Sequence, residues 1–283
     1  MTTAPSRSLA RYLVCPPDFY QVSYAINPWM KPQVWQAETD YWTRRSRDQW
    51  QRLTDLMKSL GWILETIAPQ PDLPDMVFSA NHAVVIGKKA LVARFAKAQR
   101  EGETPWAQQW FQSHGFETKI CPVMFEGAGD ALYDASLDVV FMGYGFRSIP
   151  EAAGEISSFF GKKVVPLQLR DPRFYHLDTC YCPIDGGKAI FTPLAFTDEA
   201  QATLRRQYGD RLIEIPEEDA LQFACNAINA GRDIVVPKIS ARTQILLQDN
   251  GLIPHMVELD SFILAGGASK CLTLRLDVGS GIP

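Results

Sequence analysis

The sequence lacks an excess of charge of either sign. Lys and Arg number 28 and Asp and Glu number 32 among its 283 residues, so the formal net charge is −4. A domain that binds a phosphate backbone or an anionic membrane usually carries a clear surplus of basic residues. The composition therefore argues against nucleic acid and membranes as partners.

Long hydrophobic runs are also missing. A helix that spans a bilayer needs about 20 consecutive apolar residues, but the run at 137–146 is short and is interrupted by Asp138 and Gly143. The polar start of the chain carries Arg7 and Arg11 where a signal peptide would have an apolar stretch. We therefore expect a cytoplasmic protein.

Cysteine is infrequent and scattered. The six cysteines are Cys15, Cys121, Cys180, Cys182, Cys225 and Cys271. Their dispersal over a long chain favours reduced thiols over a disulfide framework. A zinc site at Cys180 and Cys182 would need a second ligand pair at zinc-site spacing, which the sequence does not contain.

What the sequence does contain is an ordinary globular composition, with 46% hydrophobic and 11% aromatic residues. Helical spacing and stop signals predict helices at 40–60, 106–114, 149–160, 199–208, 218–228 and 240–250. Short apolar runs predict strands at 62–67, 83–86, 90–93, 139–142, 164–169, 189–191, 234–237 and 272–276. Because the two kinds of element alternate without a long linker, we predict one α/β domain over residues 1–283.

The most informative run is residues 265–276 near the C-terminus. Leu272, Leu274 and Leu276 alternate as on one face of a strand, which places Cys271 at the mouth of that strand, just after a glycine turn. An accessible thiol at this place is a candidate nucleophile, and a buried structural cysteine is the alternative.

A second run, residues 174–182, contains His176 and Asp178. Period-two alternation places both on one face of a strand, where a general acid/base and an anchoring carboxylate could point into one cleft. The alternative is a hydrogen-bonded strand at the surface.

Two loops add further candidates. Residues 126–130, Glu-Gly-Ala-Gly-Asp, form a glycine-rich turn that lacks the Lys and Ser/Thr of a phosphate loop. Alone, this turn indicates only solvated acids. Asn81 ends the loop at 74–81, just before the strand at 83–86, and alone it is a turn residue.

Taken together, these motifs resemble a known family. Glu-Gly-x-Gly-Asp at 126–130, His-Leu-Asp-Thr at 176–179 and Gly-Gly-x-x-x-Cys-Leu-Thr at 266–273 are similar to the guanidino-modifying superfamily of amidinotransferases, arginine deiminases and dimethylarginine dimethylaminohydrolases. The resemblance extends from Cys15 to Thr273. It implies a five-bladed α/β propeller, or pentein, of ββαβ units with the active site at the central channel. At about 57 residues per blade, the chain would fit one propeller.

The resemblance also implies a mechanism. Cys271 would attack the central guanidino carbon, and His176 would protonate the departing nitrogen and then activate water. Glu126 would orient His176, and Asp178 would pair with the terminal guanidino nitrogens. This chemistry implies no metal and no organic cofactor.

Further positions are expected to bind the substrate. The family pattern maps Arg100 and Arg147 onto the substrate carboxylate, because a guanidinium offers a planar pair of donors; a surface ion pair is the alternative for each. Asn27 is expected to cap the pocket, and Asn81 and Ala265 complete the substrate-binding positions. The expected partner is a small molecule, arginine or a methylated arginine, and homo-oligomerisation is left open.

The residue at position 81 distinguishes among the members of the superfamily. This position looks acidic in deiminases and dimethylarginine hydrolases, whereas Phe-Ser-Ala-Asn at 78–81 is similar to arginine dihydrolases, which convert arginine to ornithine, carbon dioxide and two ammonia. An amide both donates and accepts, so it suits a neutral ureido group as well as a cation. Asp178 also argues against dimethylarginine, because the resemblance implies no acid there in dimethylarginine hydrolases. We therefore predict a cysteine-dependent arginine dihydrolase that forms an S-alkylthiouronium intermediate.

Three alternatives remain. The first is a dimethylarginine dimethylaminohydrolase or arginine deiminase that stops at citrulline, and the second is an amidinotransferase. The third is a catalytically silent propeller that acts as a binding module. The joint presence of Glu126, His176 and Cys271 argues against this third alternative, because a silent module has no chemical need for all three.

Overall fold

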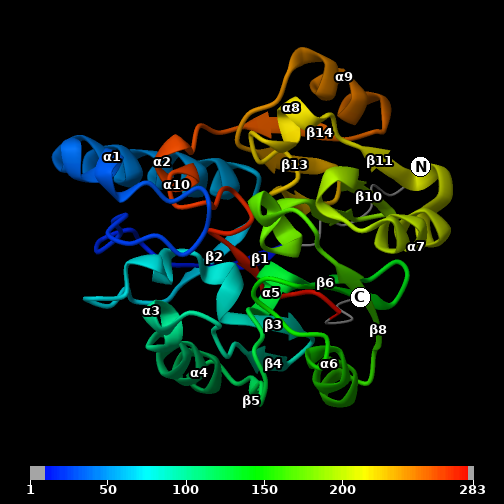
Figure 1. The fold of residues 1–283 in the computed structure, drawn as a ribbon, viewed down its shortest axis with the longest axis horizontal. Coiled ribbons are helices and arrows are strands. Elements are labelled where there is room, and N and C mark those ends of the chain that lie inside the picture. The colour runs from blue at the N-terminus through cyan, green and yellow to red at the C-terminus, as the bar shows by residue number, and fades with distance from the viewer. Residues whose placement is uncertain (1–9, 280–283) are drawn as a thin grey trace.

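The computed structural model describes residues 10–279, and this part of the chain forms five three-stranded sheets arranged around a ring (Figure 1). In each sheet, the middle strand pairs antiparallel with one neighbour and parallel with the other. Parallel neighbours need a crossover connection, and a helix between the middle strand and its parallel partner supplies it in every sheet. Each sheet with its helix is therefore one ββαβ blade.

The blades follow the chain in order. The first contains β15 (Leu274–Arg275), β1 (Arg11–Val14) and β2 (Ile63–Thr66), with α1 (Pro32–Ala37) and α2 (Thr39–Ser59). The second contains β3 (Ala83–Ile86), β4 (Lys89–Val92) and β5 (Glu117–Ile120), with α3 (Ala98–Glu101) and α4 (Glu103–Ser113). The third contains β6 (Ala131–Asp134), β7 (Val139–Tyr144) and β8 (Lys163–Gln168), with α6 (Ala152–Phe160).

The last two blades repeat this plan. The fourth contains β9 (Tyr181–Ile184), β10 (Lys188–Phe191) and β11 (Leu212–Glu214), with α7 (Asp198–Tyr208). The fifth contains β12 (Ile228–Ala230), β13 (Asp233–Val236) and β14 (Ile253–Met256), with α9 (Ala241–Asp249). Short helices lie in the connections: η1 (Pro74–Val77), η2 (Ser79–His82), α5 (Gly127–Asp130), η3 (Pro172–Phe174), η4 (Leu177–Thr179), η5 (Pro193–Ala195), η6 (Gly209–Arg211), α8 (Glu217–Ala220) and α10 (Asp260–Ile263).

The two ends of the described chain close the ring. β15 pairs antiparallel with β1, with Tyr12 opposite Arg275 and Leu13 opposite Leu274. The first blade is thus built from both ends of the sequence, and the loop that carries Cys271 comes directly before this closing strand. Closure therefore places the C-terminal motif next to the loops of the other blades.

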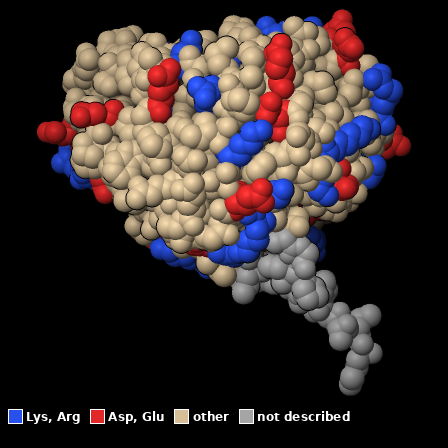
Figure 2. All heavy atoms as spheres, turned by 90° about the horizontal axis from the view of Figure 1, so that it is seen from below, with Lys and Arg blue, Asp and Glu red and all other residues tan. Residues whose placement is uncertain are grey.

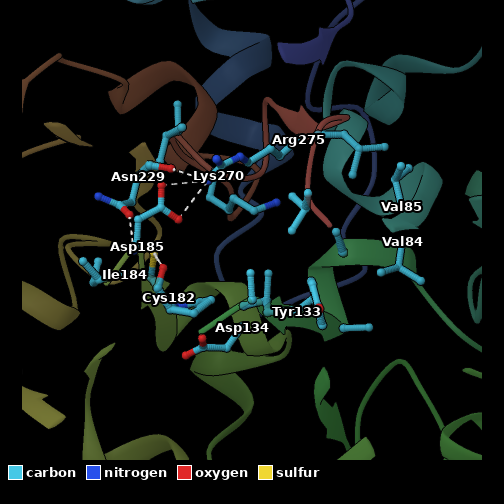
Figure 3. Close-up of a pocket in the computed structure, with 18 of the residues that line it drawn as sticks. Val84, Val85, Tyr133, Asp134, Cys182, Ile184, Asp185, Asn229, Lys270 and Arg275 are labelled. Atoms are coloured by element: carbon cyan, nitrogen blue, oxygen red, sulfur yellow. Dashed lines mark hydrogen bonds and ion pairs between the residues drawn. The ribbon is translucent and has the colours of Figure 1, made fainter. Parts of the chain in front are cut away.

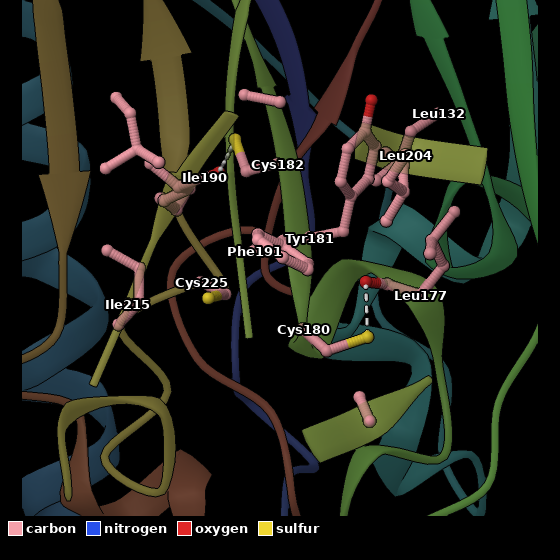
Figure 4. Close-up of a cluster of buried hydrophobic side chains, with 14 of the residues drawn as sticks. Leu132, Leu177, Cys180, Tyr181, Cys182, Ile190, Phe191, Leu204, Ile215 and Cys225 are labelled. Carbon is pink, nitrogen blue, oxygen red and sulfur yellow. Dashed lines mark hydrogen bonds between the residues drawn. The ribbon is translucent and has the colours of Figure 1, made fainter. Parts of the chain in front are cut away.

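The apolar core lies mainly between neighbouring sheets and the helices outside them. Figure 4 shows one part of it, where Tyr181, Phe191 and Cys225 pack together. The Tyr208 hydroxyl donates to Asp134 over 2.6 Å, so this buried phenol has its polar partner. Cys225, which the sequence placed on a helix, lies fully buried in this core.

Most predicted helices and strands are confirmed to within a few residues, but the helix predicted at 218–228 is wrong in its second half. α8 ends at Ala220, Phe223 has a left-handed φ of 64°, and β12 begins at Ile228. Residues 223–228 are all buried. Burial on every side removes the periodicity that separates a helix from an irregular apolar segment.

Two predicted strands near the candidate residues also differ. His176 is not in a strand: it precedes η4, and β9 begins only at Tyr181. The strand expected at 272–276 is reduced to Leu274–Arg275, so Cys271 lies in a turn instead of at a strand mouth. In both cases a tight turn mimics the alternation of a strand.

The surface carries both signs of charge. On the face shown in Figure 2, Lys and Arg side chains are interspersed with Asp and Glu side chains. Across residues 10–279, no helix combines the length and the apolar character that a membrane crossing requires.

Candidate active site

The nine candidate residues come together where the loops of different blades meet. Six of them line one small cavity: Asn27, Asn81, Arg100, Arg147, Ala265 and Cys271. The other three, Glu126, His176 and Asp178, are fully or almost fully buried and contact members of this group. Residues separated by up to about 240 positions in the chain thus form one cluster, although their roles in catalysis stay predictions.

The Cys271 sulfur lies between a carboxylate and an amide. Sγ is 3.4 Å from Oδ2 of Asp178, and it accepts a hydrogen bond of 3.1 Å from Nδ2 of Asn226. Burial and the Asp178 charge raise the pKa of the Cys271 thiol well above its ordinary value, although a backbone bond from Ala268, the Asn226 bond and the charge of Lys270 oppose the shift. Burial and Asp178 therefore favour the thiol over the thiolate, and a positive charge nearby would favour deprotonation.

Glu126 holds His176 and Arg147 together. Its Oε2 atom is 2.8 Å from Nε2 of His176 and 3.0 Å from a terminal nitrogen of Arg147, while Oε1 accepts the Ala96 backbone N–H. Burial alone would raise the pKa of Glu126, but Arg147 and His176 outweigh it and hold that pKa well below its usual range. Glu126 is thus a permanent anion that fixes the orientation of the imidazole.

The glycines of the 126–130 turn are required by close packing. A Cβ atom on Gly129 would lie 2.1 Å from Nδ2 of Asn81 and 3.4 Å from Cγ of His176. Gly127 has a φ of 59°, and a Cβ atom there would lie 2.6 Å from the Asn81 carbonyl oxygen. Only residues without side chains let this turn approach both Asn81 and His176.

The second acid of that turn has a structural function. Oδ2 of Asp130 accepts a 2.6 Å hydrogen bond from the Ser148 hydroxyl, and Oδ1 accepts the backbone N–H of Leu177 over 3.1 Å. Asp130 therefore anchors η4, the short helix that His176 precedes. The expectation of two solvated acids in this turn is wrong, because both Glu126 and Asp130 are buried.

Arg100 is a buried brace for Asn81. It makes two hydrogen bonds to Glu103, of 2.7 and 2.8 Å, and one of 3.1 Å to the Asp75 carbonyl. Its other terminal nitrogen donates a 2.8 Å hydrogen bond to Oδ1 of Asn81. Because a guanidinium only donates, the amide oxygen must face Arg100, and the amide nitrogen then donates to the Glu126 carbonyl over 3.3 Å.

Arg147 is held in a similar way. Besides Glu126, it donates to the Ile26 carbonyl over 3.0 Å, and its guanidinium lies 4.7 Å from the centre of the Tyr175 ring. These contacts exclude the surface ion pair that was the alternative for Arg100 and Arg147, since both are at most 4% exposed. Binding of a substrate carboxylate by the two arginines stays a prediction.

Asn27 connects the N-terminal loop to the turn before Cys271. Its Nδ2 donates to the Ala265 carbonyl over 2.9 Å, and its Oδ1 accepts backbone N–H groups of Trp29 and Met30. The amide is therefore satisfied within the protein, and it fixes one wall of the cavity.

The cavity itself is small. Its volume is about 10 Å³, enough for one water molecule. A larger cavity, of about 330 Å³, lies on the other side of the Lys270–Cys271 turn and is lined by Tyr133, Asp134, Cys182, Asp185, Lys270 and Arg275 among others (Figure 3). None of the nine candidate residues lines this larger cavity.

Sequence reasoning missed Asn226, which contacts both Cys271 and the backbone of Asp178. One signal could have found it: a single amide inside the apolar run 223–228 must find partners if that run is buried. The weak zinc interpretation gains no support, since no group of three or more His, Cys, Asp or Glu residues within 10–279 is arranged to hold a metal ion.

Comparison with known proteins identifies the family. The model of the family described as N,N dimethylarginine dimethylhydrolase, eukaryotic, matches residues 19–276. The N(G),N(G)-dimethylarginine dimethylaminohydrolase of Mycobacterium tuberculosis is 36% identical over 266 residues, which cover 94% of this chain and 85% of that protein. The chain belongs to the N,N dimethylarginine dimethylhydrolase family. This membership confirms the resemblance to the guanidino-modifying superfamily.

A second relative carries a different activity. The bifunctional arginine dihydrolase/ornithine cyclodeaminase ArgZ of Synechocystis sp. is 38% identical over 269 residues, or 94% of this chain. This chain spans only 37% of the length of ArgZ. The crystal structure of the N-terminal domain of ArgZ, an arginine dihydrolase, bound to its substrate superposes on this chain with a TM-score of 0.88 and 37% sequence identity. The superposition covers 94% of this chain and 97% of that domain. The likeness confirms the predicted five-bladed fold.

Proposed function

We propose that this chain is an arginine dihydrolase, which converts L-arginine and two waters to ornithine, carbon dioxide and two ammonia. The observation that carries the proposal is the Asn81 amide beside the Cys271 and His176 side chains. Its oxygen faces Arg100, and one of its two amide hydrogens goes to the Glu126 carbonyl. Within residues 10–279 no acceptor is found for the other hydrogen, which leaves it free to donate to the oxygen of a neutral ureido group.

The first hydrolysis follows from the charges of the site. The substrate guanidinium enters beside Asp178 and Cys271, and its positive charge favours both the carboxylate and the thiolate. The Cys271 thiol gives its proton to His176, and the resulting thiolate attacks the central carbon. His176 passes that proton to the leaving nitrogen, and ammonia departs. His176 then removes a proton from water, which attacks the S-alkylthiouronium carbon, and the C–S bond breaks to give citrulline.

The second hydrolysis is what separates a dihydrolase from a deiminase. Citrulline must stay bound although it has lost its positive charge, so its ureido oxygen needs a donor. An Asn amide provides this donor, whereas an Asp carboxylate at the same place would repel the oxygen. The likeness to the ArgZ domain, an arginine dihydrolase, supports the same choice, because the superposition covers 94% of this chain.

The second candidate is hydrolysis of dimethylarginine to citrulline, and the relative from Mycobacterium tuberculosis supports it. The buried carboxylate of Asp178 beside Cys271 argues for unmethylated nitrogens, because a carboxylate needs N–H donors to replace its lost hydration. The products distinguish the two activities.

The experiment measures products from arginine, dimethylarginine, agmatine and citrulline, with ammonia counted independently. The wild type should give two ammonia per ornithine from arginine and little free citrulline. Asn81→Asp should shift the product to citrulline with one ammonia, while Asn229→Asp, a matched change outside the small cavity that Cys271 lines, should not. If the wild type stops at citrulline, the dihydrolase proposal is wrong. If Asn81→Asp still makes ornithine, Asn81 is not the residue that permits the second step.

A further inference from the structure

Asn226 occupies a central place in the cluster although no motif contains it. It lies in the irregular segment between α8 and β12, and its side chain is fully buried. Its Oδ1 atom accepts the backbone N–H groups of Ala268, Lys270 and Cys271, at 3.2, 3.0 and 3.2 Å. One side-chain oxygen thus holds the whole turn that carries the nucleophile.

The other end of the same amide faces the reacting atom. Nδ2 donates to the Cys271 sulfur over 3.1 Å and to the Asp178 carbonyl over 2.9 Å. Since Oδ1 accepts only from N–H donors, the amide has one orientation, in which its N–H groups must point at sulfur and carbonyl. The Asn226 side chain therefore links the Cys271 turn to η4.

The electrostatic surroundings give the amide a chemical consequence. The charged or titratable groups that face Cys271 are Asp178, Lys270 and Tyr175. Asp178 disfavours a thiolate, whereas Lys270 favours one. Lys270 is only partly buried and lines the large cavity, where solvent weakens its effect. Besides the backbone bond from Ala268, the Asn226 N–H is the neutral side-chain donor in direct contact with the sulfur. A donor to an anion makes a stronger bond than a donor to a thiol.

We propose that Asn226 is a further catalytic residue, which stabilises the Cys271 thiolate through its amide N–H while its oxygen fixes the turn that carries Cys271. The inference rests on the proposed function in that Cys271 is the nucleophile. The two ends of the amide have separable tasks, because an Asp side chain keeps an oxygen for the three N–H groups but replaces the N–H donor by a second anionic oxygen.

The experiment compares the wild type with Asn226→Asp. The rate of Cys271 alkylation by iodoacetamide is followed from pH 6 to 11.5, with the modified residue located by mass spectrometry, and kcat and KM for arginine are measured at pH 7.5. We expect the alkylation midpoint to rise by about one pH unit or more and kcat to fall about tenfold or more, because less thiolate forms at a given pH. KM should change less than about threefold, since the turn keeps its acceptor.

The matched control is Asn229→Asp, which changes another buried amide on β12 that bonds to Asp185, Gly231 and Asp233 instead of Cys271. Its alkylation midpoint should equal that of the wild type. A wild-type midpoint in folded Asn226→Asp would overturn the inference and leave Asn226 with only a role in the turn.

A measurement on the unmodified side chain keeps the test independent of folding of the variant. In protein labelled with ¹⁵N-asparagine, one side-chain amide should shift with the same pH midpoint as Cys271 alkylation, and this shift should vanish in Cys271→Ala. If no asparagine amide follows that midpoint, the inference is wrong. Failure of the proposed function would look different: arginine would not be consumed or its hydrolysis would stop at citrulline, or the Cys271 thiol would not react in the wild type.

Discussion

Replacing Asp178 by Asn should stabilise the protein at high pH although it removes activity. Burial raises the pKa of Asp178 to about 7, against the opposing effects of Lys270 and of the Cys271 and Asn226 side chains. In the unfolded chain the pKa of an Asp side chain is about 3.9. The folded state therefore binds the proton more tightly, and the free energy of unfolding falls as pH rises through the window from about 4 to 7.

The size of the effect follows from this difference in pKa. A difference of about three units corresponds to roughly 4 kcal/mol of destabilisation once the pH is well above 7, and to about 1.5 kcal/mol at pH 5. Asp178→Asn removes this dependence. The advantage of the variant in unfolding free energy should therefore grow by about 2 to 3 kcal/mol between pH 5 and pH 8.

The assay is urea unfolding followed by tryptophan fluorescence at pH 5, 6, 7 and 8, with Asp249→Asn at the exposed end of α9 as the matched control. The control should differ from the wild type by the same small amount at every pH. A difference for Asp178→Asn that stays flat or shrinks with rising pH would refute the reasoning. That outcome would show that Lys270 stabilises Asp178 as a carboxylate in the resting protein.

Three further predictions concern the same cluster. Cys271→Ser should leave the fold and arginine binding intact and reduce turnover below a few per cent, as isothermal calorimetry and ammonia release would show, because an alcohol is a much weaker nucleophile than a thiolate. Arg147→Lys should raise the KM for arginine about tenfold or more, because Lys lacks the planar pair of donors, and should lower kcat, because Glu126 loses a partner. Efficient turnover of agmatine, which has no carboxylate, would contradict the predicted carboxylate contact. Gly129→Ala should lower kcat/KM at least about tenfold, since its Cβ atom would displace the Asn81 amide, whereas Gly154→Ala in α6, which has open space, should raise stability by up to about 1 kcal/mol in thermal unfolding.

The sequence could predict most candidate residues because they lie in short motifs whose order along the chain resembles a known family, and this resemblance then supplied Arg100, Arg147, Asn27 and Ala265. Asn81, the 126–130 turn, His176 with Asp178, and Cys271 were all found in this way. Helices with one exposed face were found as well: α2 buries Leu53 and Met57 on one side and exposes charged side chains on the other. Amphipathic periodicity survives in such helices because water lies on one side of them.

Only the tertiary structure decided how the motifs act together. The strand expected around His176 and the helix expected around Asn226 are both irregular turns, because residues packed at the centre of the ring are buried on every side and carry no period. The pairing of β15 with β1, which brings Cys271 beside Asp178 and Asn226, joins residues far apart in the chain. No local spacing encodes such a contact: it exists because five blades close into a ring, and the closure fixes which buried amide meets the sulfur.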